Sequence, residues 1–141
     1  MSAPLAIMLG DRTGVGPELV AKLTATFVPP PGLAMRVIGD PDVWERGCAI
    51  AGVPATLAGA WTFVPRRADL AAPLGRVSAA AGGEVLETLG ALAREAMAGT
   101  IGGIVYAPLN KQAMKLAGHA AGDELDHLNR LMPAAGPTGE I

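Results

Sequence analysis

The sequence predicts an α/β fold, because short apolar segments typical of strands alternate along it with longer segments typical of helices. Half of the 141 residues are hydrophobic but only 4% are aromatic, so the core must consist of Ala, Val, Leu, Ile and Met. Two of the apolar segments, residues 5–9 and 103–106, end abruptly in polar turns. Open α/β sheets bind ligands at such turns, which favours a small-molecule enzyme.

Two prolines mark helix starts in the first half of the chain. Pro17 and Pro41 each follow an apolar segment and a turn, and proline suits the first helical turn because its missing N–H would have no partner there. Trp44 and Ile50 are expected to pack against the core. The expected elements are, in order, a strand over about 4–9, a helix over about 17–26, a strand over about 35–40 and a helix that begins at 41.

A long helix is the clearest element of the second half. Val85, Leu89, Leu92 and Ala96 recur every three or four residues, which is typical of one buried helical face. Residues 103–106 are continuously apolar, as in a parallel strand covered on both faces. The expected elements are strand-like pieces at 55–57 and 61–64, a helix over 78–98, a strand over 103–106, a helix over 111–116 that ends at Gly118, and a helix over 123–132.

Charge and composition exclude several classes of protein. A formal net charge of -2 gives no basic surface for a polyanion, so nucleic acid is not an expected partner. No apolar run approaches the roughly 20 residues that cross a bilayer, and the N-terminus has no secretory pattern. The single cysteine, Cys48, has no partner for an internal disulfide and is expected to pack in the core. We therefore expect a cytoplasmic protein.

The end of the chain reads as unfinished. Residues 137–141 form a turn signal that leads into what resembles another strand. We expect an incomplete chain, with a natural short protein that has a frayed tail as the alternative.

The glycine-rich turn over residues 10–18 allows two interpretations. Glycines let backbone N–H groups approach an anion at a helix N-terminus, which would make a phosphate loop. The segment has neither the P-loop pattern nor a complete Gly-x-Gly-x-x-Gly pattern, so a tight strand-to-helix connection explains it equally well. Within it, Asp11 and Arg12 form either a surface ion pair or a polar clamp at a ligand cleft.

Asn110 and Lys111 follow the strand at 103–106 and are candidates for chemistry. The Lys111 ammonium could attract a carboxylate or phosphate, or hold developing enolate charge, with Asn110 donating a hydrogen bond beside it. The alternative is an exposed lysine at a helix start.

The two histidines, His119 and His127, are the candidates for a metal site. Asp123 and His127 are four residues apart, a spacing that places both on one helical face, and Asp126 is nearby. Asp123 also fits a helix N-cap, where a carboxylate is favoured.

Several ordered motifs resemble the 4-hydroxythreonine-4-phosphate dehydrogenase family. Residues 10–18 resemble its opening Gly-Asp/Glu-Pro-Ala-Gly-Ile-Gly-Pro-Glu. Residues 75–82 are similar to its Gly-Lys-x-Ser-x-x-x-Gly segment, and residues 106–111 to its Thr-Ala-Pro-Ile-Asn-Lys turn. The terminal residues 139–141 lie where the family chain continues. Since the resemblance covers essentially the whole chain, residues 1–141 are interpreted as the N-terminal portion of a longer, two-lobed dehydrogenase.

The resemblance implies a fold, a reaction and partners. The fold is a three-layer α/β sandwich of the isocitrate/isopropylmalate dehydrogenase type, assembled as a homodimer. The reaction is NAD-dependent oxidation of a secondary alcohol on a small hydroxy acid, followed by loss of carbon dioxide, in pyridoxine biosynthesis. A divalent metal ion (Zn, Mg, Mn or Co) polarises the oxygens, and NAD accepts the hydride. The family's metal-binding histidines and most NAD contacts follow the present region, so this chain alone is expected to be inactive.

The resemblance also assigns site residues and reveals one departure. Lys111 is the expected catalytic residue, and Asn110 and Asp11 are expected substrate contacts. Where the family has Gly-His-Thr-Glu, this chain has Gly122-Asp123-Glu124-Leu125, so Asp123 and Glu124 are positional candidates for substrate contact. Their carboxylates would disfavour a phosphorylated substrate, and neither histidine lies in the family register.

Three other functions stay open at this point. A divergent dehydrogenase could act on another hydroxy acid or a ring dihydrodiol. A truncated chain could serve as a noncatalytic dimerisation module. An acyl or phosphoryl transferase of similar fold could use the glycine-rich turn and Lys111 to hold a phosphate, without dependence on NAD.

Overall fold

The computed structural model describes residues 2–120 and 124–133 and has four parallel strands in the order β3-β2-β1-β4. The α/β prediction is confirmed, and most expected elements begin and end within about two residues of those observed. The elements are β1 (Leu5–Met8), α1 (Gly16–Thr26), β2 (Met35–Gly39), α2 (Pro41–Ala51), β3 (Trp61–Pro65), α3 (Ala79–Met97), β4 (Gly103–Tyr106), α4 (Lys111–Leu116) and α5 (Glu124–Leu131).

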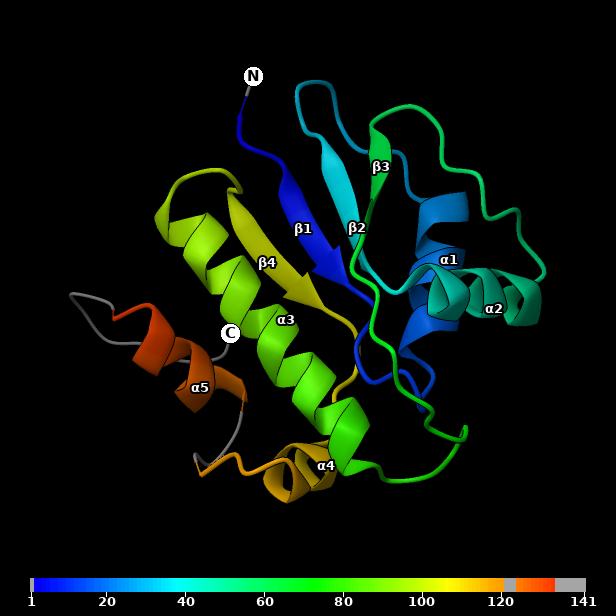
Figure 1. Ribbon diagram of the computed structural model, residues 1–141. Coiled ribbons are helices and arrows are strands. Elements are labelled where there is room, and N and C mark those ends of the chain that lie inside the picture. Colours follow the sequence, from blue (N-terminus) through cyan, green and yellow to red (C-terminus); the bar gives the residue numbers. More distant parts are fainter. Residues whose placement is uncertain (1, 121–123, 134–141) are drawn as a thin grey trace.

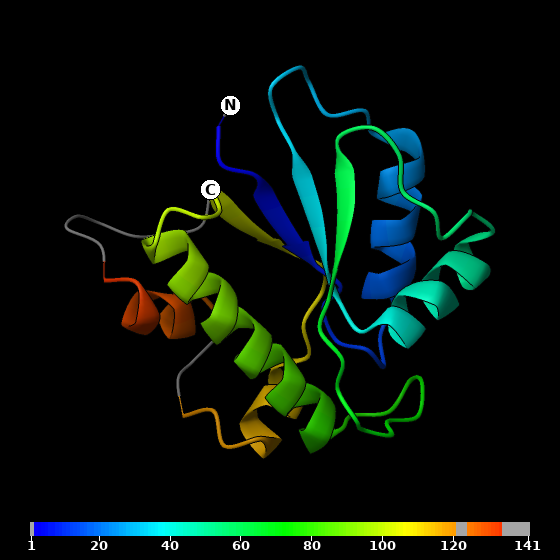
Figure 2. The same cartoon turned by 45° about the horizontal axis from the view of Figure 1, so that its top comes forward.

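The described residues form three layers, with helices on both faces of the sheet (Figure 1). Helices α1 and α2 pack against each other on one face, and α3 covers the other, with α4 and α5 packed against α3. The turned view shows the same separation, with α1 and α2 on the far side of the sheet from α3 (Figure 2). The expected three-layer sandwich is therefore confirmed.

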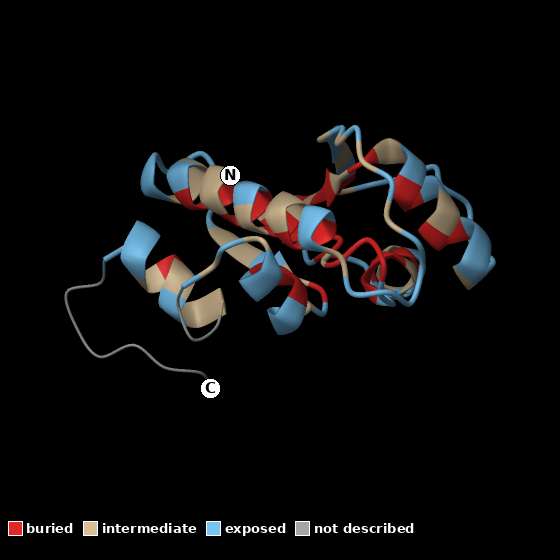
Figure 3. Ribbon diagram, turned by 60° about the horizontal axis from the view of Figure 1, so that its bottom comes forward, coloured by how far each residue is buried: buried red, intermediate tan, exposed pale blue. Residues whose placement is uncertain are grey.

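Alternation along β1 divides the core between the two faces of the sheet. Leu5 and Ile7 pack in the cluster with α1 and α2, while Ala6 and Met8 belong to the cluster with α3, α4 and α5. Buried residues of the helices gather on the sides that face the sheet (Figure 3). Successive side chains of a strand point to opposite faces of the sheet, so β1 contributes residues to both clusters.

The long helix α3 follows its sequence pattern closely. The Ser78 side chain accepts a hydrogen bond from the Ala81 N–H and caps the helix, as serine commonly does at this position. Val85, Leu89 and Leu92 are buried as expected. The C-terminal end of α4 is likewise followed by Gly118 in a left-handed conformation, with a φ of 93°.

Three expectations about packing were wrong or only half right. Ile50 is 54% exposed because it lies on the outer side of α2, whereas Trp44 is buried and its indole N–H donates to the Ala55 carbonyl. Residues 55–57 form no strand. Val105 is 41% exposed, because β4 is an edge strand that the helices do not cover on both faces.

Two further sequence-based expectations concern Cys48 and membrane spans. Cys48 is a free, buried cysteine in the cluster under α1 and α2, and burial followed by the charge of Glu45 raises the pKa of its thiol. Its packing role is confirmed. Within the described ranges, none of the helices has the length and apolar character required to cross a bilayer.

Candidate functional site

The candidate site lies at the carboxyl edge of the sheet, between β1 and β4. These strands are neighbours in the sheet, but the chain leaves β1 toward β2 on one side and returns to β4 on the other. The helices that follow them, α1 and α4, lie on opposite faces (Figure 1). A reversal of strand order opens a crevice at the carboxyl ends, and ligands of open α/β sheets bind there.

The turns after β1 and β4 are joined by close backbone contacts. Gly10 has a φ of 78°, and a Cβ at this position would lie 2.6 Å from the Pro108 carbonyl oxygen. The Asp11 N–H donates to the same Pro108 oxygen at 3.2 Å. Only glycine combines this backbone conformation with so close an approach, so the first residue of the turn fixes the distance between the two loops.

A third segment, the loop before α3, completes the rim of the cleft. The Gly75 N–H donates to the Thr13 carbonyl oxygen at 2.7 Å, which ties this loop to the turn after β1. The resulting cleft has a volume of about 310 Å³. Its lining residues come from the three segments and are Asp11, Thr13, Gly14, Val15, Gly75, Arg76, Val77, Pro108, Leu109 and Asn110.

Asp11 is the most informative side chain of the cleft. It is 2% exposed, and its Oδ1 accepts hydrogen bonds from both the N–H and the hydroxyl of Thr13, each at 2.7 Å. Its Oδ2 is buried and has no hydrogen-bond partner among the described residues. A buried carboxylate oxygen without a partner is unfavourable, so this atom is suited to accept a hydrogen bond from a ligand group.

The glycine-rich turn is a tight strand-to-helix connection in which three of the backbone amides bind within the protein. The Asp11 N–H is bonded to Pro108, the Thr13 N–H to the Asp11 carboxylate, and the Gly14 N–H to the Asp11 carbonyl oxygen at 3.1 Å. These three amides are therefore used within the protein. A phosphate loop instead presents its successive N–H groups to the anion.

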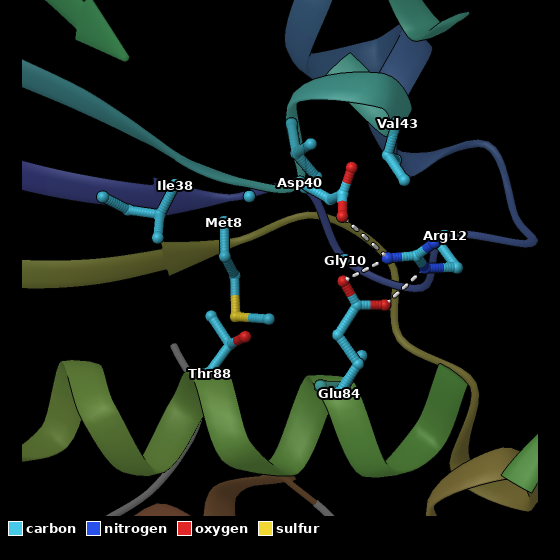
Figure 4. Close-up of a pocket in the computed structure, with 11 residues that line it drawn as sticks. Met8, Gly10, Arg12, Ile38, Asp40, Val43, Glu84 and Thr88 are labelled. Atoms are coloured by element: carbon cyan, nitrogen blue, oxygen red, sulfur yellow. Dashed lines mark hydrogen bonds and ion pairs between the residues drawn. The ribbon is translucent and has the colours of Figure 1, made fainter. Parts of the chain in front are cut away.

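Arg12 does not line the cleft. Its side chain lies between Asp40 at the end of β2 and Glu84 on α3 and is held by both carboxylates (Figure 4). Its guanidinium donates to Glu84 at 2.6 and 2.9 Å, to Asp40 at 3.4 Å, and to the Leu70 carbonyl oxygen at 3.2 Å. The Arg12 side chain is 9% exposed. Of the two interpretations of Asp11 and Arg12, the surface pair is wrong, because Arg12 instead joins α3 to the end of β2. Of the proposed polar clamp, Asp11 alone lines the cleft.

The charges of this network are matched to their surroundings. Burial raises the pKa of Asp40, but N–H groups of Ala68 and Asp42 and the Arg12 guanidinium outweigh burial, so the net pKa is lowered. The hydrogen bond to Glu84 raises the pKa of Arg12 against the opposing effect of burial. A cavity of about 10 Å³ beside these groups has room for one water at most. Arg12 is therefore a fixed cation and not a ligand-binding group.

Asn110 and Lys111 lie next to each other but face different surroundings. Asn110 lines the cleft, and its Oδ1 accepts from the Ala113 N–H as the cap of α4, which leaves its NH2 group as the donor for other partners. The Lys111 side chain is 58% exposed, with its Nζ 3.9 Å from Oε2 of Glu124. Lys111 therefore begins α4 beside the cleft without lining it.

The candidates on α5 form a separate group. Glu124 pairs with Lys111 at a distance too long for a hydrogen bond and does not line the cleft, and Asp123 lies outside the described residues. The rings of His119 and His127 meet edge to face, with centroids 4.9 Å apart. Burial, then the charges of His119 and Arg130, lowers the pKa of His127.

No metal site is formed by the residues that the structure describes. Within 2–120 and 124–133, no group of three or more His, Cys, Asp and Glu side chains could hold a metal ion. The Nε2 of His127 is buried and has no hydrogen-bond partner in that part of the chain. The pairing of His127 with Asp123 that the sequence suggested lies outside what can be described.

Three residues around the site were not singled out by the sequence. Thr13 orients Asp11, Arg76 contributes an exposed cation to the cleft lining, and Glu84 holds Arg12. Arg76 lies in a segment that the family resemblance included, which was a usable signal. Glu84 lies 72 positions from Arg12, and no local pattern connects them.

Comparisons with known proteins agree with this architecture. The family model of the pyridoxal phosphate biosynthetic protein PdxA matches residues 33–138. A 4-hydroxythreonine-4-phosphate dehydrogenase of Beijerinckia indica is 34% identical over 82% of this chain and 37% of its own. A D-threonate 4-phosphate dehydrogenase of Bordetella bronchiseptica is 38% identical over 82% of this chain and 37% of its own.

A solved structure also resembles this chain over almost its whole length. The crystal structure of a 4-hydroxythreonine-4-phosphate dehydrogenase from Burkholderia phymatum superposes with a TM-score of 0.78 and 27% identity, covering 93% of this chain and 44% of that one. The chain thus spans less than half the length of these relatives. With a family model that matches most of its length, the chain belongs to the PdxA family.

Proposed function

We propose that the protein is a dehydrogenase that oxidises the secondary alcohol of a phosphorylated hydroxy acid with NAD. The observation that carries this proposal is the cleft at the reversal of strand order, where the buried Oδ2 of Asp11 has no protein partner among the described residues. An acceptor of this kind suits a ligand hydroxyl. The activities for which the relatives are named support the reaction class.

The residues of the cleft would have separate roles toward such a substrate. Asp11 would accept a hydrogen bond from the alcohol through Oδ2, and the Asn110 NH2 group would donate to an oxygen nearby. Arg76 would pair with an anionic group, because its exposed side chain is the one cation among the residues that line this cleft in the described ranges. This arrangement would bind the hydroxyl at the floor of the cleft and the anion at its rim.

Lys111 is proposed as the group that stabilises negative charge when carbon dioxide leaves. Its side chain is 58% exposed and its Nζ lies 3.9 Å from Oε2 of Glu124, which is longer than a hydrogen bond, so it would be free to turn toward a bound substrate. NAD, when bound, would supply the hydride acceptor.

The metal ion and the NAD contacts are proposed to come from residues beyond this chain. The described residues do not provide a metal-binding set. The longer relatives contain more than half of their residues outside the matched region. A homodimer, a cytoplasmic location and a place in pyridoxal phosphate synthesis are further parts of this proposal.

Two phosphorylated compounds follow from the relatives as substrates. They are 4-hydroxythreonine 4-phosphate and D-threonate 4-phosphate, the compounds after which the two relatives are named. The two differ at the second carbon, where one has an ammonium group and the other a hydroxyl. Glu124 lies outside the lining of the cleft, so its carboxylate does not oppose a phosphate there.

The test is NAD reduction by the native protein, followed at 340 nm, with added divalent metal. Both phosphates are compared with their unphosphorylated forms, and the intact mass of the protein is measured in parallel. We expect turnover of a phosphorylated compound and at least a hundredfold lower kcat/KM without the phosphate. A folded protein that is longer than residues 1–141 by mass and reduces no NAD with any of the four compounds would contradict the proposal and favour a noncatalytic module.

A further inference from the structure

We infer that Thr13 is a positioning residue that determines which kind of group the cleft accepts. The inference rests on the proposed function and concerns the same site. Thr13 is 5% exposed, and both its N–H and its hydroxyl bind the same oxygen of Asp11. Two short hydrogen bonds to one carboxylate oxygen fix the plane of the carboxylate and leave the other oxygen for a ligand.

The consequence is a site for a single hydrogen-bond donor. Because Oδ1 of Asp11 is occupied twice, a guanidinium or amidine cannot bind both carboxylate oxygens in the usual paired geometry. Oδ2 is buried, so a ligand group must be small to reach it. An alcohol O–H meets both conditions, whereas a phosphate or carboxylate would be repelled by the same oxygen.

Thr13 itself is held in place by backbone contacts on both sides of the turn. Its carbonyl oxygen accepts from the Gly75 N–H at 2.7 Å, and the carbonyl oxygen of Arg12 before it accepts from the Arg46 guanidinium at 2.5 Å. The hydroxyl can therefore be removed while these anchors remain. This separates the orientation of Asp11 from the position of the loop.

The experiment compares two variants of Thr13 in the native protein. Thr13→Val keeps the shape and removes the hydroxyl, whereas Thr13→Ser keeps the hydroxyl. For D-threonate 4-phosphate we expect kcat/KM to fall about tenfold in Thr13→Val, in line with a hydrogen bond to a charged group, and Thr13→Ser to restore most of it. Thr24→Val is the matched control, because it removes a hydroxyl that donates to the Ala21 carbonyl oxygen within α1. It is expected to leave kcat/KM unchanged.

A substrate analogue separates positioning from general damage. The 3-deoxy analogue of D-threonate 4-phosphate lacks the alcohol, so its inhibition constant is expected to be the same in wild type and in Thr13→Val. Parallel weakening of this analogue, or a Thr13→Ser variant as poor as Thr13→Val, would show a merely structural role and overturn the inference.

Asp11→Asn provides a second route if Thr13→Val does not fold. The donors of Thr13 hold the amide oxygen in place of Oδ1, which puts the NH2 group where Oδ2 stood. In this variant kcat/KM for D-threonate 4-phosphate should fall at least tenfold, while the inhibition constant of the 3-deoxy analogue should stay as in wild type. If the wild type turns over D-threonate 4-phosphate and none of the variants shows these selective losses, the inference alone is overturned. If the wild type neither binds nor oxidises any of the phosphorylated compounds, the proposed function is overturned with it.

Discussion

Replacing Arg12 by methionine tests whether the buried ion network holds the site together. Methionine fills a similar volume without charge, so the substitution leaves the carboxylates of Asp40 and Glu84 without their cation. The Asp40 side chain is 5% exposed and that of Glu84 is 17% exposed. Removing one partner of a buried ion pair destabilises by about 3–5 kcal/mol.

The structure places the expected loss at the lower end of this range. Asp40 keeps hydrogen bonds from the Ala68 N–H at 2.8 Å and the Asp42 N–H at 2.9 Å, and Glu84 is exposed enough to gain water. We therefore expect Arg12→Met to lower the free energy of unfolding by about 3 kcal/mol at pH 7. The measurement is urea unfolding followed by circular dichroism, with a shifted midpoint and an unchanged slope.

Two controls make this prediction specific to the network. Arg67→Met removes a cation that is 72% exposed and 3.9 Å from Asp42, so no measurable change is expected. Adding Glu84→Gln to Arg12→Met removes one stranded charge and should recover part of the loss. A loss below about 1 kcal/mol in Arg12→Met, or strictly additive losses in the double variant, would refute the reasoning.

Acid provides an independent check on the same network. The pKa of Asp40 is lowered in the folded protein, so its contribution to stability is present above the unfolded pKa of about 3.9 and is lost as the pH falls through the folded value. The Arg12 charge is one of the causes that lower the pKa of Asp40, so the Asp40 contribution to stability is smaller in Arg12→Met. The difference in unfolding free energy between wild type and Arg12→Met should therefore shrink as the pH falls below about 4.

Three further predictions concern α3, α5 and the candidate catalytic residue. Gly82→Ala should destabilise by about 1–3 kcal/mol because its Cβ would overlap the Ala113 carbonyl of α4. Gly90→Ala on the same helix should stabilise slightly, because its Cβ would meet the Arg94 side chain at an ordinary contact distance of 3.7 Å. Chemical unfolding of both variants measures this, and equal effects would contradict it. The pKa of His127 is lowered in the folded state, so its stabilisation is complete above about pH 6.5 and decreases as the pH falls; melting temperatures should drop more between pH 7.5 and 5.5 in wild type than in His127→Gln. Lys111→Ala should reduce kcat at least tenfold with little change in melting temperature, and normal kinetics in this folded variant would remove Lys111 from the site.

The sequence predicted the strands and helices well because their signals are local. The spacing of Val85, Leu89 and Leu92 identifies the buried face of α3 without knowledge of any partner. It could not predict that β4 lies at the edge of the described sheet, because residues 103–106 are equally apolar at an edge or in the centre. The exposure of Val105 depends on which helices cover it, which is a property of the whole fold.

The candidate site was predictable in place but not in its interactions. Asp11 and Asn110 follow strands, and parallel strands bring their carboxyl ends to one edge, so both were found from the sequence. The partners of Arg12 were not, because Asp40 and Glu84 are 28 and 72 positions away. Two neighbouring charges in a turn read as a pair, whereas burial separates them into different networks.

Arg12 and Arg76 serve different properties of the protein, the first its stability and the second its preference for a ligand. Arg12 binds groups from the end of β2, from α3 and from the loop at Leu70, so any change to it acts on all three of these segments. Arg76 is exposed, and its loop is tied to the turn after β1 through the Gly75 N–H. Changes at Arg76 should therefore alter the preference for a phosphate at little expense in stability, whereas changes at Arg12 should lower stability before they alter preference.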